Sequence, residues 1–226
     1  MKKYIYIIAL FLSLWGVTSC DDAYSSYEDF IQDGEQSYSP VIDSLDVFSG
    51  NERIKIVAGF NNAPNVKALK VTWKSGDSIR IMDIENKGIG EQYYDVILDN
   101  FPEGIYLMRI ASVDKFDNTS LTQLFSVRTY GDFYISNLKN RKIDSKSLNG
   151  NTLVLNWKLP EQYTEKTVIS YTNTEGDEAQ YTVDDEENTS TIENVDGNSK
   201  IEYQTYFNPE GKSIDLFSSL KESIEL

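Results

Sequence analysis

The sequence predicts an all-β protein that consists of two tandem β-sandwiches behind a secretory signal peptide. Apolar residues alternate with polar ones over short runs, which is the period of a half-buried strand. Turn signals rich in Gly, Pro, Asn and Asp separate these runs, and residues 40–130 contain no sustained helical period. The pattern restarts after about ninety residues, close to the ~100 residues of a seven-stranded sandwich.

The first 22 residues have the layout of a signal peptide. Lys2 and Lys3 precede an apolar run over 4–17, and small residues then lead to Cys20, the only cysteine of the chain. A membrane-spanning helix would need ~20 apolar residues. Val17-Thr18-Ser19-Cys20 resembles a bacterial lipobox, at which the cysteine is lipidated and becomes the new N-terminus. We therefore expect a lipoprotein signal peptide over 1–19 and a lipid anchor on Cys20; an ordinary cleaved signal beside a chance cysteine is the alternative.

The composition of the remaining 207 residues limits the partners and the kinds of catalysis that are available to the protein. They carry 19 basic and 36 acidic side chains, a net charge of −17, which argues against nucleic acid as a partner. Histidine is absent, which excludes Ser-His-Asp and Cys-His catalysis and histidine-ligated zinc. With the cysteine lipidated, only carboxylates, Lys, Tyr and hydroxyl groups remain for catalysis. We expect no enzymatic activity and no cofactor.

Residues 20–39 are predicted to be a lipid-anchored tether. This segment mixes Ser, Asp, Glu, Gln and Gly with isolated aromatics and shows no sustained period. A short helix could form before Gly34, but a flexible spacer is the simpler interpretation.

The first sandwich is predicted over 40–130. Alternation is clearest where Ile54, Ile56, Ala58 and Phe60 are spaced two apart. Turns such as Ser49-Gly50-Asn51-Glu52 punctuate the pattern. The strands expected here cover residues 41–48, 54–60, 69–73, 78–84, 93–98, 106–110 and 121–128.

The second sandwich is predicted over 131–226, after a boundary at Tyr130-Gly131-Asp132. Its clearest strand alternates at Leu153, Leu155, Trp157 and Leu159 before Pro160. The strands expected here cover residues 153–159, 167–173, 180–183, 190–195, 201–207 and 214–217.

Two short motifs resemble those of fibronectin type III domains. In 152–160 the tryptophan of an alternating strand is followed by a proline, as in the second strand of that family. Pro102, four residues before Tyr106, resembles its tyrosine corner, in which the hydroxyl bonds to nearby backbone. Phe60 stands at the tryptophan position of the first sandwich, and no corner proline precedes Tyr203. We expect Trp73, Tyr106 and Trp157 to be core residues.

A longer series of motifs resembles an uncharacterised Bacteroidetes surface-lipoprotein family with tandem fibronectin-type-III-like domains. The resemblance implies an outer-membrane lipoprotein, exposed on the cell surface, and Cys20-Asp21-Asp22 resembles the acidic tags of such proteins. It implies no catalytic residues. The motifs occur at 69–73, 76–78, 101–106, 114–120, 130–134 and 140–141.

Two acidic clusters are candidate metal sites. Asp114, Asp117 and Asn118 share a tight connection and could bind calcium through oxygen ligands. Because Asn and Asp are also favoured turn residues, a plain turn is the stronger interpretation. The run of four acids at 184–187 has no glycine to bend it around an ion, so we interpret it as a solvated loop.

Exposed aromatic rings are the candidate ligand contacts. Neighbouring residues of a strand face opposite sides, so one of Tyr93 and Tyr94 should point outward. Phe116 lies in a turn with polar neighbours. A patch formed by Phe116 and the outward tyrosine could bind a ligand, and aromatic rings can stack on sugars.

These observations favour a non-catalytic binding or adhesion module of the cell envelope. The partners that we expect are the membrane, through the lipid, and a glycan or envelope protein. A purely structural spacer is the first alternative. A glycosidase that uses two carboxylates is a distant one.

Overall fold

The computed structural model describes residues 37–85 and 88–226 and confirms the predicted all-β fold. The signal peptide, Cys20 and most of the predicted tether lie outside these residues. Residues from Ser39 onward form one compact unit with two separate hydrophobic cores. Among the described residues, no helix has the length and apolar character needed to cross a membrane.

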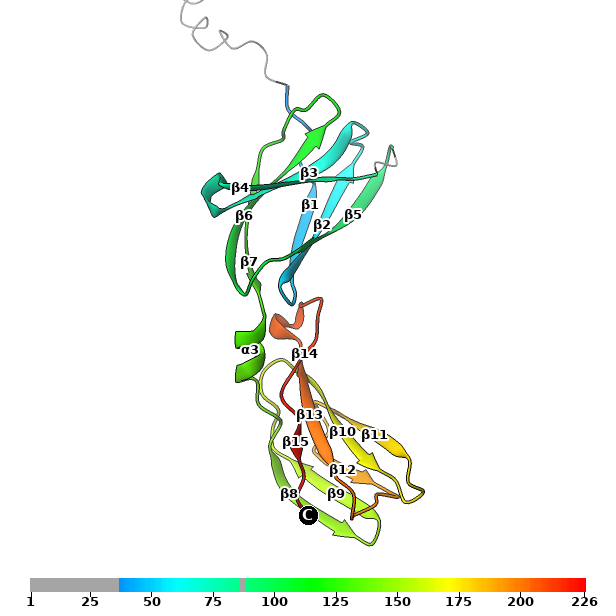
Figure 1. Ribbon diagram of the computed structural model, residues 1–226. Helices are drawn as coiled ribbons and strands as arrows, with labels where there is room; N and C mark the ends of the chain where they lie inside the picture. The colour runs from blue at the N-terminus through cyan, green and yellow to red at the C-terminus, as the bar shows by residue number, and fades with distance from the viewer. Residues whose placement is uncertain (1–36, 86–87) are drawn as a thin grey trace, which may run out of the picture. The chain divides into compact units, whose positions relative to one another are not determined.

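The first sandwich consists of two antiparallel sheets (Figure 1). One sheet has the strand order β1-β2-β5, with β1 (Ser44–Ser49), β2 (Arg53–Asn61) and β5 (Glu91–Asp99). The other has the order β4-β3-β6-β7, with β3 (Val66–Trp73), β4 (Ser78–Asp83), β6 (Gly104–Asp114) and β7 (Gln123–Thr129). A short 3₁₀ turn, η1 (Lys74–Gly76), joins β3 to β4.

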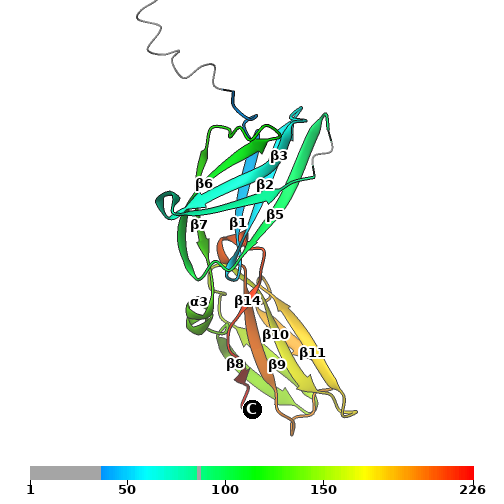
Figure 2. The same cartoon turned by 45° about the horizontal axis from the view of Figure 1, so that its top comes forward.

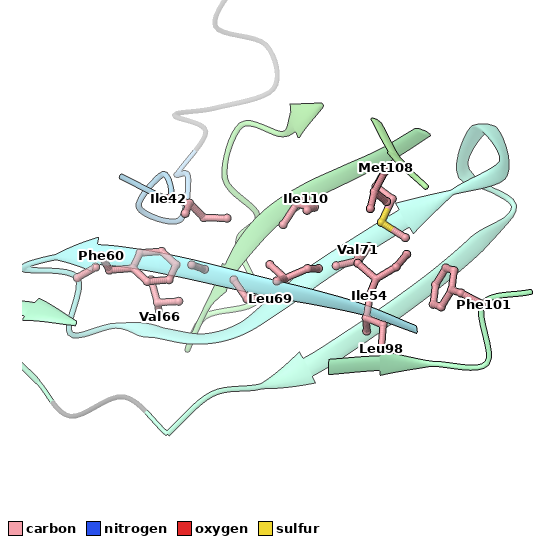
Figure 3. Close-up of a cluster of buried hydrophobic side chains, with 14 residues drawn as sticks. Ile42, Ile54, Phe60, Val66, Leu69, Val71, Leu98, Phe101, Met108 and Ile110 are labelled. Atoms are coloured by element: carbon pink, nitrogen blue, oxygen red, sulfur yellow. The ribbon is translucent and has the colours of Figure 1, made fainter. Parts of the chain in front are cut away.

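The inward residues of both sheets meet in the first core (Figure 3). Ile54, Ile56 and Ala58 of β2 are fully buried, as the alternation predicts, and Phe60 is 3% exposed at the position where a tryptophan was expected in this fold. Trp73 is half-buried at the edge of this core, with its ring 5.0 Å from that of Phe101.

The tyrosine corner of the first sandwich is present. The Tyr106 hydroxyl donates to the carbonyl oxygen of Pro102 at 2.7 Å, and the half-buried ring packs edge-on against Phe101. In the second sandwich the Tyr203 hydroxyl instead donates to the Glu222 carboxylate at 2.9 Å. The Tyr203 hydroxyl therefore has a hydrogen-bond partner although no corner proline precedes it.

The second sandwich repeats the same strand order. One sheet has the order β12-β9-β8, with β8 (Ile143–Asn149), β9 (Thr152–Trp157) and β12 (Thr189–Ile192). The other has the order β11-β10-β13-β14, and β15 also pairs with β13; its strands are β10 (Thr164–Thr172), β11 (Glu178–Asp184), β13 (Glu202–Phe207), β14 (Phe217–Ser218) and β15 (Glu222–Ser223). Figure 2 shows the strands of this sandwich, among them β8, β9, β10 and β11, in a second view.

Several details of this sandwich differ from the sequence-based prediction. Strand β8 and the short helix α3 (Asp132–Asn137) were not predicted. Only Phe217 of the predicted strand 214–217 is in a strand, β14, because the preceding residues belong to a long loop. Leu159, which alternation placed inside, is 85% exposed because β9 ends at Trp157.

Trp157 is the central aromatic residue of the second core and is 5% exposed. Its indole N–H donates to Ser190 Oγ at 2.9 Å, so the polar end of the ring has a partner. The Tyr203 ring lies 5.9 Å away, and the Arg141 guanidinium carbon lies 5.8 Å from the ring centre. The predicted core position of Trp157 is confirmed.

The loop between β13 and β14 contacts the β1–β2 turn of the first sandwich. Arg53 Nε donates to Asp215 Oδ2 at 2.8 Å, and Arg53 Nη2 reaches the other carboxylate oxygen. The backbone N–H of Asn51 also donates to Asp215, at 2.8 Å. The Ile214 N–H donates to the carbonyl oxygen of Ser49 at 2.8 Å. Charged and backbone hydrogen bonds thus link the loop to the turn.

An aromatic cluster lies beside these hydrogen bonds. The Tyr130 ring lies 4.6 Å from Tyr134 of α3 and 5.5 Å from Phe217. The Tyr130 hydroxyl donates to Glu210 at 3.1 Å, and burial raises the pKa of Tyr130 to about 12. The residues between the sandwiches therefore have their own packed contacts.

Candidate functional site

Tyr93 is the outward tyrosine of the pair on β5. It is 59% exposed, whereas Tyr94 packs against the first core with its ring 6.1 Å from that of Phe60. This arrangement follows from strand alternation, which sends adjacent side chains to opposite faces of a sheet.

A glycine on the neighbouring strand makes room for the Tyr93 ring. Gly59 of β2 pairs with Ser44 on one side and with Tyr93 on the other. A Cβ at Gly59 would lie 2.8 Å from Tyr93 Cε1 and 2.2 Å from Ser44 Oγ, which is closer than side chains pack. A glycine within a strand often marks such a close approach. The Tyr93 ring therefore packs beside the backbone of Gly59, where no side chain intervenes.

Polar side chains surround the ring and form a shallow groove of about 230 Å³. The Asp43 carboxylate accepts the backbone N–H of Asn61 at 2.6 Å, and the Tyr93 hydroxyl donates to Glu91 Oε1 at 2.5 Å. The hydrogen bond to Glu91 and its negative charge raise the pKa of Tyr93. The lining residues are Asp43, Ser44, Gly59, Phe60, Asn61, Glu91 and Tyr93.

This combination suits a small polyhydroxylated ligand. An exposed ring offers an apolar face, and the carboxylates and the Ser44 hydroxyl can accept hydrogen bonds from ligand hydroxyls. Ordered polar groups around an apolar contact are typical of sites that orient small ligands.

The carboxyl groups with clearly shifted pKa values do not have the property that a glycosidase acid needs. That acid requires a raised pKa so that it stays protonated near neutral pH. The pKa values of Asp114, Glu202 and Asp215 are all lowered. The described residues contain no cluster of three or more acidic groups arranged to bind a metal ion.

Phe116 is exposed but is not among the residues that line the groove around Tyr93. It is 67% exposed in the turn after β6, and the Lys115 ammonium lies 5.0 Å from its ring centre. Tyr93 belongs to the β1-β2-β5 sheet, whereas this turn joins strands of the other sheet. Among the described residues, no ring contact joins the two, so the groove contains Tyr93 without Phe116.

The connection that contains Asp114, Asp117 and Asn118 is a self-bonded turn. The Asp114 carboxylate accepts the backbone N–H groups of Phe116 and Asn118, both at 2.9 Å, and the side-chain amide of Asn118 at 3.0 Å. Desolvation acts to raise the pKa of Asp114, but these hydrogen bonds outweigh it and the pKa is lowered. Asp117 forms an ion pair with Lys67. The side chains of Asp114 and Asn118 therefore stabilise the turn.

The acidic run at 184–187 begins at the last residue of β11 and continues into a loop, and its last residue has protein partners. Glu187 accepts hydrogen bonds from Tyr181 at 3.1 Å and from Ser190 at 2.5 Å. Asp184, Asp185 and Glu186 are exposed, in line with the solvated loop that we expected.

A wider hollow of about 530 Å³ lies beside Arg141 in the second sandwich. Arg141 Nε donates to the carbonyl oxygen of Lys158 at 2.9 Å, and Nη1 donates to that of Asp184 at 3.2 Å. The preceding Asn140 accepts the backbone N–H of Thr205 at 2.8 Å. These two residues fasten the segment before β8 to the second sandwich, which gives the Asn140-Arg141 motif a structural role.

Sequence reasoning selected Tyr93 but missed the residues around it. Ser44, Gly59 and Asn61 come from other strands and meet Tyr93 only through the strand register. The one available signal was Gly59, because a glycine inside an alternating strand indicates a bulge or a close approach.

The strand order of both sandwiches is that of fibronectin type III domains. The FN1–FN3 domains of chicken CNTN1 are similar, with 13% sequence identity and a TM-score of 0.42; the match covers 84% of this chain and 66% of that one. A two-domain fibronectin type III segment of chicken tenascin has 16% identity and a TM-score of 0.30, with coverage of 83% and 99%. None of the curated proteins matches the chain.

By its strand order, the protein is a tandem fibronectin-type-III-like β-sandwich protein. The chain belongs to the DUF4998 family, described as a domain of unknown function, which matches residues 20–217.

Proposed function

We propose that this protein is an outer-membrane lipoprotein, anchored through Cys20 and exposed on the cell surface, that binds a glycan with its first sandwich. The lipobox-like motif and the signal-peptide layout support the anchor. The family match begins at residue 20, which is the residue that lipidation would make the N-terminus.

The observation that carries the binding role is the position of Tyr93 over Gly59. Most aromatic side chains of a sandwich fill its core or pair across strands. Here the backbone leaves space for a ring that stays 59% exposed and is bordered by Asp43 and Glu91. An exposed ring with polar neighbours is the usual platform for stacking on the apolar face of a sugar.

A structural spacer is the second candidate, and the contacts between β13–β14 and the β1–β2 turn favour it. The ion pair of Arg53 with Asp215 and the Tyr130–Phe217 ring contact both join residues of the two sandwiches. A spacer needs such contacts but has no use for the Tyr93 groove.

A glycan array with the purified full chain in detergent tests the binding role. Tyr93→Ala should weaken binding to the captured glycans by about tenfold, since a ring contact of ~1 kcal/mol or more is lost. Phe133→Ala is the matched control, because Phe133 is 76% exposed on α3 and outside the groove. The absence of any glycan binding, or equal loss in both variants, would leave the spacer as the better proposal.

Membrane fractionation tests the anchor. Cys20→Ala should move the protein from the detergent phase to the aqueous phase or leave the precursor uncut, because several buried acyl chains contribute most of the membrane affinity. Protease treatment of intact cells tests surface exposure. A variant that stays in the detergent phase after signal cleavage would contradict lipidation at Cys20.

A further inference from the structure

The outer face of the β4-β3-β6-β7 sheet carries exposed aliphatic side chains. Large apolar residues alternate on its strands with the inward core residues, and each is more than half exposed. The face is formed by Ile79 at 55%, Ile81 at 61%, Ile105 at 71%, Leu107 at 52% and Leu124 at 59% exposure.

Strand register places cations among these aliphatic residues. Ile79 pairs with Thr72, Thr72 with Arg109, and Arg109 with Leu124, which makes one row across the sheet. In the next rows Ile81 pairs with Lys70, and Ile105 pairs with Arg128. Each cation therefore lies next to an apolar side chain on a neighbouring strand.

The charge of this face is opposite to that of the whole chain. Lys70, Arg109 and Arg128 lie on it, and Asp83 is the one acid at an outward position of these four strands. Among the described residues, Lys70 and Arg109 form no ion pair. The complete chain has a net charge of −15. Unpaired cations on an apolar face indicate a partner that supplies carboxylates.

We infer that this face binds an extended acidic segment of a partner protein that presents both carboxylate and aliphatic side chains on one side. Every second side chain of an extended peptide points to the same side, so the side chains that face the sheet repeat at the spacing of its outward residues. Aliphatic side chains bury apolar peptide side chains well, but they lack the flat ring that stacks on a sugar. This site is on the opposite sheet from Tyr93 and does not depend on the proposed glycan binding.

Fluorescence anisotropy with the full chain in detergent tests the inference. The probe is a labelled decapeptide in which Glu and Ile take turns at the odd positions and Ser fills the even ones, so that Glu and Ile share one side. It is used at concentrations where the free peptide is monomeric. Matched probes replace every Glu with Lys, or replace every Ile with Glu. We expect the Glu/Ile peptide to bind at least about tenfold more tightly than either control peptide, and its binding to weaken as salt is raised.

Charge reversal locates the contact. The Lys70→Glu/Arg109→Glu variant should lose about tenfold in affinity. Lys142→Glu/Lys146→Glu changes the net charge equally on the second sandwich and should stay within about twofold of the native protein. Circular dichroism checks the fold of each variant, and the salt and peptide comparisons on the unaltered protein hold even if a variant unfolds.

Several results would overturn the inference. Equal binding of the Glu/Ile and Lys/Ile peptides would show that the cations play no part, and equal binding of the peptide in which Glu replaces every Ile would show that the aliphatic residues play none. An acidic polysaccharide such as polygalacturonate that displaces the peptide and binds more tightly would assign the face to a glycan. A dimer that dissociates on Lys70→Glu/Arg109→Glu substitution, without peptide binding, would assign it to a second copy of the chain.

Discussion

A Trp157→Ala substitution removes the largest ring of the second core. The ring is 5% exposed, its N–H donates to Ser190, and Tyr203 lies 5.9 Å away. Truncating a buried tryptophan costs ~3–5 kcal/mol. Ser190 keeps its hydrogen bond to Glu187, so little extra penalty arises from an unpaired hydroxyl. We expect a loss of about 4 kcal/mol, which is a large part of the ~5–15 kcal/mol typical of a domain.

Hydrogen exchange followed by mass spectrometry can assign this loss to one sandwich. Peptides from β9, β10 and β13 should exchange much faster in Trp157→Ala, with a smaller change in peptides from β2 and β6. Trp157→Phe keeps an aromatic ring but removes the N–H donor, and it should cost an intermediate amount. Leu159→Ala is the matched control, because Leu159 is 85% exposed and surface changes usually stay within about 0.5 kcal/mol.

Unchanged exchange in the second sandwich of Trp157→Ala would refute this reasoning. The same conclusion would follow if Leu159→Ala destabilised the protein as much as Trp157→Ala. In either case the indole would not be the centre of the core, and Trp157 would become a candidate for ligand contact.

Three further perturbations follow from specific contacts. Tyr106→Phe removes the hydrogen bond to Pro102 and should lower the free energy of unfolding by about 1 kcal/mol in chemical denaturation. The hydrogen bond from Arg53 lowers the pKa of Asp215, so the stabilisation by this pair is present above the ordinary carboxyl pKa near 4 and is lost as pH falls through the lowered value. Asp215→Asn should lower the free energy of unfolding by about 1 kcal/mol at neutral pH. The variant should also lack the part of the acid destabilisation that protonation of Asp215 causes, as measured by chemical denaturation at about pH 7 and about pH 3. Calcium or a chelator should leave the melting temperature unchanged, because the Asp114 carboxylate already accepts three N–H groups of its turn; a calcium-dependent rise would contradict this.

Alternation predicted the strands that have one buried face. Strands β2 and β9 bury every second side chain, so a period of two is visible in their sequences. Strand β8 was missed because it lies at the edge of its sheet and its middle residues, from Asp144 to Ser147, are all exposed. Helix α3 has only six residues, too few to show a helical period.

The long loop after β13 shows a different limit of sequence reasoning. Residues 214–216 have the composition of a strand, but the Ile214 backbone pairs with Ser49 and the Asp215 side chain with Arg53. These partners are distant in the sequence: Arg53 and Asp215 are separated by 162 residues. A local pattern cannot show such pairings, because tertiary contacts decide the conformation of the segment.

The candidate groove could be predicted only in part. Local alternation was enough to predict that one of two adjacent tyrosines points outward. The groove also needs Ser44 and Gly59 beside that tyrosine, and their positions depend on the register of three strands. A shift of one residue in that register would move every side chain of the strand to the other face. The expected pairing with Phe116 depended on the arrangement of two sheets, which alternation does not determine.

The first sandwich has two outer faces with different chemistry, and this difference bears on the spacer alternative. On the β1-β2-β5 face, Lys55 pairs with Asp95 and Arg53 pairs with Asp215, so both cations have carboxylate partners. On the β4-β3-β6-β7 face, Lys70 and Arg109 have no such partners among the described residues. Because the sheets of a sandwich present their outer faces in opposite directions, the two faces can bind different ligands at the same time. A spacer would need neither an exposed ring over bare backbone nor unpaired cations among exposed aliphatic residues. The two features therefore favour the two binding roles that we propose over a spacer.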